Sequence, residues 1–347
     1  MEIRVPVKVL QDLECRLFEA AGLTHEDAKL TAEVLIDADL RGIYTHGSFR
    51  VPVYLDRLRD GSVHARPNTR IVTDRLATAV LDGDHGLGQV SGVTAMNLAI
   101  EKARTCGTGL VTVVNGHHYG AGAYFANQAA KANMIGLALC NTKPLMPPTG
   151  GKRPLIGTNP VAIGIPAAKN PPFILDIALS QVAHGRIRVA RMKGEPIPDG
   201  WALDKDGNPT NDPEKGMFGL LLPAGGHKGY GLAMAVDILT GMLCGGGWSI
   251  DVKPMDSTKE HQNSAQLYAA INIEAFRDLD GFKQEMDEYF KLIKECPRQP
   301  GVEDVYYPGE RAVQRCRQNL ELGIPMQEKL VEQIRIRAEA LGVKATF

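Results

Sequence analysis

Short β-rich segments separated by glycine- and proline-rich turns fill the middle of the 347-residue chain, and they constrain its fold more than any other feature. Between and after them, residues 90–104, 121–133 and 229–244 have apolar residues at helical spacing. This alternation predicts a mixed α/β domain with a mixed sheet. We expect strands over residues 77–81, 110–114, 135–140, 161–165, 173–175 and 267–273.

Both ends of the chain have a helical pattern. Thr24 with Asp27 three residues later resembles a capping box at the start of a helix. We expect the termini to pack together as one helical module, residues 1–75 with 278–347, beside an α/β domain of residues 76–277. The expected helices are residues 7–21, 24–40, 51–58, 278–295, 311–319 and 325–341, with a polar loop over 246–265.

The composition excludes several classes of partner. With 39 basic and 40 acidic residues the net charge is −1, which does not favour nucleic acid or an anionic membrane. No apolar stretch reaches the roughly 18 residues of a membrane helix, and the N-terminus lacks a signal-peptide core, so we expect a cytoplasmic protein. The cysteines lie far apart and no metal motif is present, so we expect free thiols and no bound metal.

A glycine-studded turn over residues 224–231 opens into the apolar run 232–243. Free backbone N–H groups and the positive end of the helix dipole gather at such a helix start, and Lys228 adds a full charge. The turn therefore predicts a site for a small anion. The alternative is a tight turn with a solvated lysine.

His46, Arg50 and Tyr54 are spaced four residues apart, so an early helix start would place all three on one face. Arginine binds a carboxylate through two charge-assisted hydrogen bonds, and histidine exchanges a proton near neutral pH. These groups suit a hydroxy acid. Because Pro52 belongs in a first helical turn, His46 can instead lie in the preceding loop with Thr45. The alternative is an ordinary helix with a satisfied histidine.

Three further polar stretches end predicted strands or turns. Residues 115–122 follow a strand and open a helix, so His117 or His118 can point into a site at the strand end. Asp176 can accept from ribose hydroxyls or bond to its own backbone. The turn over residues 157–160 carries polar side chains that can face a ligand.

These features together suggest a nicotinamide cofactor, yet the dinucleotide-binding fingerprint of the Rossmann fold is missing. Residues 86–92 have one residue too many before the last glycine. If a dinucleotide binds, another fold holds it.

Ordered motifs cover nearly the whole chain: residues 41–47 with Arg50, His118 before residues 120–121, then 147–160, 176–178, 228–232 and 307–310. In these the chain resembles the malate/L-lactate dehydrogenase-type oxidoreductases, and within them the ureidoglycolate dehydrogenases most. His117 stands where the family usually has another residue.

The resemblance implies a non-Rossmann nicotinamide-binding fold, a homodimer and reversible oxidation of a 2-hydroxy acid with NAD or NADP. It implies that His118 is the proton acceptor and that His46, with Thr45 beside it, matches a proton donor. Arg50 and Tyr54 match substrate carboxylate ligands. We also expect Thr158 and Asn159 to contact the substrate. The expected cofactor contacts are Gly120, Thr142, Asp176, Ile177, Ala178, Lys228, Gln266, Pro308, Gly309 and Glu310.

We therefore expect a dehydrogenase of the ureidoglycolate, malate or lactate type. Hydride leaves C2 while His118 or His46 removes the hydroxyl proton and Arg50 holds the carboxylate. Asp176 near a ribose would favour NAD over NADP. Two alternatives remain open: a cyclic 2-imino acid reductase of the same family, and a non-catalytic binding protein that keeps the pocket.

Overall fold

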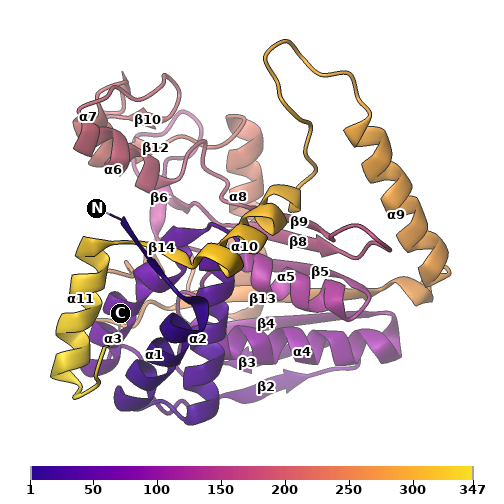
Figure 1. The fold of residues 1–347 in the computed structure, drawn as a ribbon, viewed down its shortest axis with the longest axis horizontal. Coiled ribbons are helices and arrows are strands. Elements are labelled where there is room, and N and C mark those ends of the chain that lie inside the picture. The colour runs from indigo at the N-terminus through magenta and orange to yellow at the C-terminus, as the bar shows by residue number, and fades with distance from the viewer. Residues whose placement is uncertain (1, 346–347) are drawn as a thin grey trace.

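A seven-stranded mixed sheet forms the centre of the computed structural model, which describes residues 2–345 (Figure 1). The strands are β1 Glu2–Val5, β2 Arg70–Asp74, β3 Thr78–Asp82, β4 Thr108–Gly116, β5 Met134–Cys140, β6 Pro144–Met146, β7 Ile156–Gly157, β8 Val161–Ile165, β9 Phe173–Ile177, β10 Ala202–Leu203, β11 Pro209–Thr210, β12 Leu220–Leu221, β13 Ser264–Asn272 and β14 Ile324–Gln327. The central sheet has the order β2-β3-β4-β13-β5-β8-β9. β3 and β4 are parallel, and every other neighbouring pair in this sheet is antiparallel.

Glycines in the sheet set how closely helix α5 approaches it. A Cβ on Gly164 would lie 2.3 Å from the Ala126 carbonyl oxygen, and one on Gly136 would lie 2.7 Å from the same oxygen. Only a residue without a side chain permits this packing. The helices are α1 Val7–Ala20, α2 His25–Leu40, α3 Val51–Arg59, α4 Gly88–Cys106, α5 Gly122–Lys131, α6 His184–Lys193, α7 Pro213–Met217, α8 His227–Thr240, α9 Leu279–Lys294, α10 Glu310–Leu322 and α11 Glu328–Ala340, with 3-10 turns η1 Tyr44–His46, η2 Ser48–Arg50, η3 Met242–Cys244, η4 Ser249–Asp251 and η5 Ile273–Ala275.

The two ends of the chain meet in one layer of helices. β1 pairs antiparallel with β14, with Val5 opposite Ile324. Buried Leu10, Leu35 and Ile334 belong to one apolar cluster drawn from both ends. Helix α9 lies apart from α11, across the molecule (Figure 1). The domain boundaries expected from the sequence stay a prediction.

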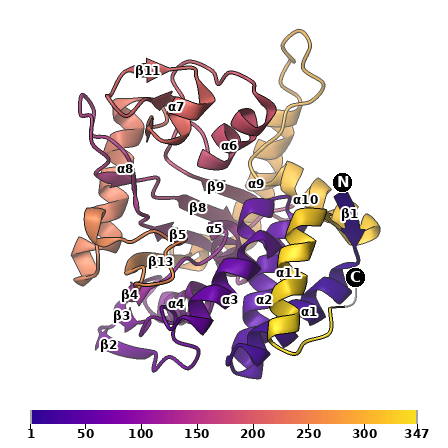
Figure 2. The same cartoon turned by 90° about the vertical axis from the view of Figure 1, so that its left-hand side faces the viewer.

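The predicted mixed α/β class is confirmed, and the strands expected over the middle of the chain correspond to β3, β4, β5, β8 and β9. The Thr24 cap is also confirmed, since its hydroxyl accepts from the Asp27 N–H at 3.0 Å. The sequence did not reveal β2 or the small unit of α6, α7 and β10 to β12, which lies above the central sheet in Figure 2. Strands of two residues are too short to show a period.

The helices within residues 2–345 include none with both the length and the apolar content needed to cross a membrane.

Candidate active site

The turn between β4 and α5 carries two adjacent histidines that have different surroundings. The His118 ring stacks against the His46 ring, with centroids 5.4 Å apart and planes at 26°. The His117 ring is 6.1 Å from the ring of His261. The sequence left open which of the two enters the site, and the structure places His118 beside His46.

Arg50 and Tyr54 approach the same two rings from the start of α3. His46 ends η1 and Arg50 ends η2, so both precede α3, which has Pro52 in its first turn. This is the loop placement of His46 that the proline predicted. The Tyr54 hydroxyl lies 2.5 Å from His118 Nδ1, and the charge of Arg50 acts on both imidazoles. Two imidazoles, a guanidinium and a phenol therefore share one volume.

Burial keeps both imidazoles neutral. Loss of solvation, together with the Arg50 charge, lowers the pKa of His46 to about 3 and that of His118 well below its usual value. Burial also lowers the pKa of Arg50 and raises the pKa of Tyr54 to about 12. Arg50 Nε is buried without a hydrogen-bond partner among residues 2–345. An unpaired donor on a buried cation is costly, so the site favours an anion there.

Hydrogen-bond donors converge on one nitrogen of His118. Gln89 Nε2 donates to the Tyr54 hydroxyl at 3.0 Å, which leaves the phenol hydrogen free to point to His118 Nδ1. The Gly120 N–H also approaches Nδ1, at 3.3 Å. The neutral ring then carries its hydrogen on Nε2. Thr45 Oγ1 lies 2.9 Å from the Nδ1 of His46, a contact that either tautomer can make.

Sequence reasoning missed two glutamines that hold these groups. Gln89 is fully buried beneath the Tyr54 hydroxyl. Gln262 Oε1 accepts from the His118 backbone N–H at 2.8 Å. A lone glutamine has no spacing signal, so only the folded chain shows that these two support the site.

A buried carboxyl anchors the segment between α2 and α3. Asp39 accepts hydrogen bonds from the Ser48 N–H at 2.8 Å and from the Ser48 hydroxyl at 2.5 Å. A Cβ on Gly47 would lie 2.0 Å from the Asp39 carboxylate, so glycine is required there. Burial raises the pKa of Asp39 to about 7, and burial with the Asp39 charge raises the pKa of Glu14.

Two residues expected to contact ligands are built into the framework instead. Gln266 is fully buried, donates to the His117 carbonyl at 2.7 Å and accepts from the Tyr268 hydroxyl at 3.0 Å. Asn159 is fully buried, accepts from the Thr142 N–H at 3.0 Å and donates to a carbonyl of α8 at 2.7 Å. Both amides are occupied by the protein, which favours a structural role for them.

The turn before α8 has the geometry of an anion site. Gly225 and Gly226 both have φ of 63°, and a Cβ on either would meet open space. Lys228 is exposed in the first turn of the helix that follows. Open backbone at a helix N-terminus with a lysine fits a phosphate group. These residues therefore fit a dinucleotide, as expected from the sequence.

Other stretches expected to bind the cofactor lie against this turn or against β9. The Ala224 N–H donates to the Leu179 carbonyl at 2.9 Å, and the Leu179 N–H donates to the Thr158 carbonyl at 2.7 Å. The Ile174 N–H donates to the Pro308 carbonyl at 3.0 Å, which places residues 308–310 beside β9. Segments far apart in sequence are thereby brought to one edge of the sheet.

Asp176 has a different partner from the ribose that the sequence suggested. Its Oδ2 accepts from the Ala123 N–H at 2.8 Å, at the start of α5. Burial raises the pKa of Asp176 to about 6. Ile177 and Ala178, which follow it, are exposed. Because one carboxylate oxygen is bonded to α5, the preference for NAD through Asp176 stays a prediction.

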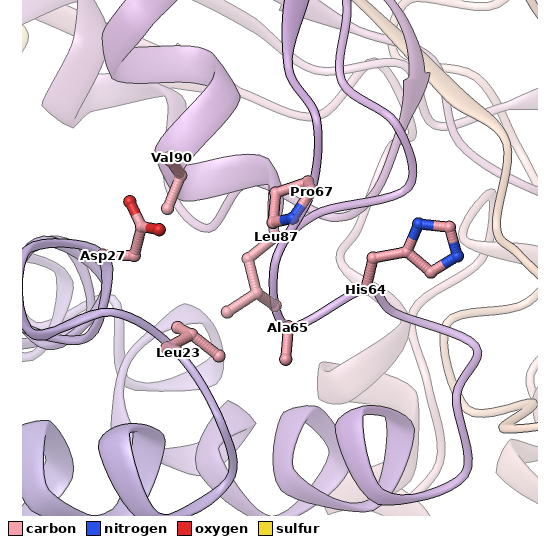
Figure 3. A pocket seen from close by; sticks show the side chains of 7 residues that line it. All are labelled: Leu23, Asp27, His64, Ala65, Pro67, Leu87 and Val90. Carbon is pink, nitrogen blue, oxygen red and sulfur yellow. The ribbon is translucent and has the colours of Figure 1, made fainter.

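A small pocket elsewhere is not a candidate for the substrate (Figure 3). It has a volume of about 10 Å³, which is at most the space of one water molecule. The ring of His64, which borders it, points away from the other labelled side chains (Figure 3). The lining residues are Leu23, Asp27, His64, Ala65, Pro67, Leu87 and Val90.

Comparison with known proteins gives one consistent family. The family model for malate/L-lactate dehydrogenase matches residues 5–335. Malate dehydrogenase of Pyrococcus abyssi is 42% identical, over 99% of this chain and 96% of that protein. Ureidoglycolate dehydrogenase (NAD(+)) of Escherichia coli K12 is 38% identical, over 84% of this chain and 83% of that protein. The solved structure of sulfolactate dehydrogenase from Methanocaldococcus jannaschii matches with a TM-score of 0.94 and 38% identity, over 99% and 98%.

The fold, the site and these relatives define an NAD(P)-dependent dehydrogenase that acts on small hydroxy acids. Its cofactor-binding fold is of the non-Rossmann kind, as predicted. The chain belongs to the malate/L-lactate dehydrogenase family. The resemblance to this family and the nicotinamide cofactor expected from the sequence are confirmed, although the malate dehydrogenase is more identical to the chain than the ureidoglycolate dehydrogenase, at 42% against 38%.

Asp39→Asn is expected to change how stability depends on pH. The carboxyl has a pKa of about 7 in the folded protein and an ordinary value of 3.8. At pH values between these two pKa values, the Asp39 carboxyl has lost its proton in the unfolded chain and keeps it in the folded protein. The wild type therefore loses stability relative to Asp39→Asn as pH rises from about 4 to 7, by at most about 1.4 kcal/mol per pH unit.

Urea unfolding of both proteins at several pH values in this range measures the effect. Glu14→Gln is expected to show the same sign, because the pKa of Glu14 is raised too. A difference between Asp39→Asn and wild type that stays constant over the range contradicts the assignment of Asp39 as a buried, proton-retaining anchor.

Proposed function

We propose that the protein interconverts a 2-hydroxy acid and a 2-oxo acid, with His46 and His118 handling the hydroxyl proton and Arg50 holding the carboxylate. One observation carries this: two neutral imidazoles are stacked at 5.4 Å within reach of the charge of a half-buried arginine, whose enclosed Nε is unpaired among residues 2–345. A carboxylate satisfies the arginine, and an adjacent hydroxyl then meets an imidazole.

Substrate binding prepares the base. The Arg50 charge is one reason why the pKa values of both imidazoles are low. A carboxylate paired with Arg50 offsets that charge, so the pKa of the neighbouring imidazole rises when the substrate binds. Proton uptake is thereby favoured only when substrate is present.

The bound nicotinamide supplies the acceptor for hydride. As the C2 hydrogen leaves with its electron pair, the hydroxyl proton passes to an imidazole and the C2–O bond becomes a carbonyl. Because the neutral His118 ring carries its hydrogen on Nε2, a proton reaches its Nδ1 through the Tyr54 hydroxyl, which gives its own hydrogen to Nδ1 and takes the substrate's in exchange. Rings 5.4 Å apart take up one proton between them, since two like charges this close repel.

Other groups have positioning roles in this scheme. Thr45 orients His46 through the 2.9 Å contact with its Nδ1. Thr158, whose hydroxyl lies 3.3 Å from that of Thr142, borders the stretch expected to hold the cofactor. The α8 turn with Lys228 and residues 308–310 would bind the dinucleotide.

Arg50→Gln is expected to lower kcat/KM for a 2-hydroxy acid by roughly 30- to 150-fold, since loss of a charge-assisted bond costs about 2–3 kcal/mol. Most of the change falls in KM, because the carboxylate is bound in both ground and transition states. Absorbance of the reduced nicotinamide measures it, with the exposed Arg59→Gln as a matched control. An unchanged KM in Arg50→Gln removes the carboxylate clamp.

Adding cyclic imino acids to the same assay separates the alternative reductase activity. Turnover of a cyclic 2-imino acid, without turnover of any 2-oxo acid, overturns the hydroxy-acid assignment. Cofactor binding with no turnover of either class would identify a non-catalytic binding protein.

A second positive group near Arg50 indicates a substrate with two anionic ends. Burial and then the Arg188 charge lower the pKa of Arg50. Arg188 lies on α6, whose Gly185 is close to the site: a Cβ there would be 3.9 Å from Thr45 Cγ2. The charges of Lys143 and Arg188 both act on His184. The opposite charge of Asp256, whose Oδ1 lies 3.6 Å from Lys143 Nζ, offsets part of the positive field at His184 and Arg50. We infer that the substrate is of the malate type, with a second acidic group directed to α6.

Arg188→Gln is expected to raise KM for a dicarboxylate such as malate about three- to fivefold, because Arg188 is exposed and its pairing with the substrate is screened by solvent. KM for lactate, which has no second acidic group, should change less than about twofold by the same reasoning. Arg186→Gln removes the same charge from the same helix and serves as control. Equal effects on malate and lactate would contradict the two-anion substrate.

An apolar face on α8 supports the expected homodimer. Leu232, Met234, Ile238, Leu239 and Leu243 along and just after this helix are all 40% to 60% exposed. Contiguous exposed apolar side chains of this kind are typical of an interface. Because α8 also carries the anion-binding turn, we propose that two copies pair beside their cofactor sites.

Leu239→Glu is expected to convert the dimer to monomer in sedimentation velocity, because pairing would bury the new charge. Leu76→Glu changes a side chain that is 80% exposed and lies on a different part of the chain, so it should leave the dimer intact. A wild-type protein that sediments as a monomer, or a dimer that survives Leu239→Glu, contradicts this interface.

A further inference from the structure

Three histidines from separate segments meet beside the β4–α5 turn, in a place that the proposed reaction does not use. His85 lies between β3 and α4, His117 follows β4, and His261 precedes β13. One nitrogen from each ring lies within 4.8 Å of the other two. The rings of His85 and His261 are stacked, with centroids 3.8 Å apart and planes at 12°.

Two buried nitrogens in this cluster have the capacity to bind a ligand. His117 is 1% exposed, and its Nε2 is buried without a hydrogen-bond partner among residues 2–345. His85 Nδ1 is buried and without a partner in the same part of the chain. Buried polar atoms in this state are rare and call for an explanation.

His261 already has the arrangement of a metal ligand. Its Nδ1 lies 2.9 Å from the Ser62 carbonyl oxygen, which can only accept. The hydrogen is therefore on Nδ1, and the lone pair is on Nε2. Histidines that bind metals usually donate their other N–H to a carbonyl or carboxylate in this way.

We propose that His85, His117 and His261 form a binding site for a divalent transition-metal ion of the Zn²⁺ type. Zinc–nitrogen bonds of roughly 2.0–2.1 Å in a tetrahedron place the nitrogens about 3.4 Å apart, so the cluster has to contract by an ångström or so. His85 and His261 are partly exposed and have room to move. Water takes the fourth position, or His64, whose ring lies 5.2 Å from that of His261.

Arg57 restricts which ions can bind. Its Nη2 lies 3.3 Å from His117 Nδ1, and a guanidinium only donates, so without metal the ring hydrogen is on Nε2. Ion binding moves this hydrogen to Nδ1 and breaks the long contact, while Nη2 keeps its 2.9 Å bond to the Glu260 carbonyl. Mg²⁺ and Ca²⁺ prefer oxygen ligands and do not offset this loss. Ions that form strong bonds to imidazole do offset it, with the charge of Asp84 acting in favour of a bound cation and that of Arg57 acting against it.

Bound metal would hold the backbone behind the proposed catalytic pair. His117 is adjacent to His118, and His261 is adjacent to Gln262, which accepts from the His118 N–H at 2.8 Å. The ion would therefore join the two segments that position His118 without touching the substrate. We expect it to raise the melting temperature.

Cobalt titration of the chelator-treated full-length protein tests the site, because tetrahedral Co²⁺ absorbs visible light. One equivalent per chain is expected, and Zn²⁺ should displace it. His85→Asn and His261→Asn should each weaken binding by at least about 100-fold, since removing even a residue that merely orients a ligand costs roughly 10–100-fold. Asparagine suits position 85, where φ is 55°.

Controls separate this site from others. His25→Gln removes a member of another candidate group, Cys15, Glu19 and His25, and His46→Gln removes a proposed catalytic imidazole; both variants should bind cobalt as the wild type does. Zn²⁺ should raise the melting temperature of the wild type and leave that of folded His85→Asn unchanged. If the wild type does not bind one equivalent of cobalt per chain, the cluster holds only water and the proposal is overturned. So does full binding in His85→Asn or His261→Asn.

Discussion

The organisation of the site depends on the burial of one cation beside two imidazoles. Arg50 is half-buried, its Nε is enclosed and unpaired among residues 2–345, and its charge helps to keep His46 and His118 neutral. Enclosing an unpaired cation costs free energy, and an anion that pairs with it lowers that cost. The electrostatic cost of enclosing this cation is thus matched to a carboxylate, and this links substrate binding to the basicity of the group that takes the proton.

The fold holds this arrangement by connecting segments that are distant in sequence. Asp39 fixes the Ser48 backbone in front of α3, while Gln89 and Gln262 hold Tyr54 and His118. These contacts use buried polar groups, which specify position well because a misplaced donor or acceptor is expensive. The cofactor edge is built similarly, by backbone hydrogen bonds between β9, the α8 turn and residues 308–310.

Local signals in the sequence were sufficient to predict much of the fold and part of the candidate site. Short β-rich segments between glycine- and proline-rich turns predicted the central strands. Pro52 predicted that His46 lies outside α3, and the glycines before Lys228 predicted an open helix start. Each is a short-range steric or periodic constraint, which is why it can be recognised without coordinates.

Long-range contacts could not be predicted in this way. Asp176 sits at a strand end, as expected, but its carboxylate caps α5, a partner set by the packing of α5 on the sheet. Gln266 and Asn159 are expected from the sequence to contact ligands, and their side-chain amides bond within the protein, which strand position alone does not show. The approach of His85, His117 and His261 likewise has no spacing signature, since three separate turns supply the rings.

The most direct test of the account is an NMR titration of the imidazole signals of His46 and His118, with and without a small 2-oxo acid and oxidised cofactor. The account predicts that both rings of the free protein stay neutral at pH values well below an ordinary histidine pKa, and that ligand raises the pKa of at least one. Ordinary titration of both rings in the free protein, unaffected by the ligand, would contradict it.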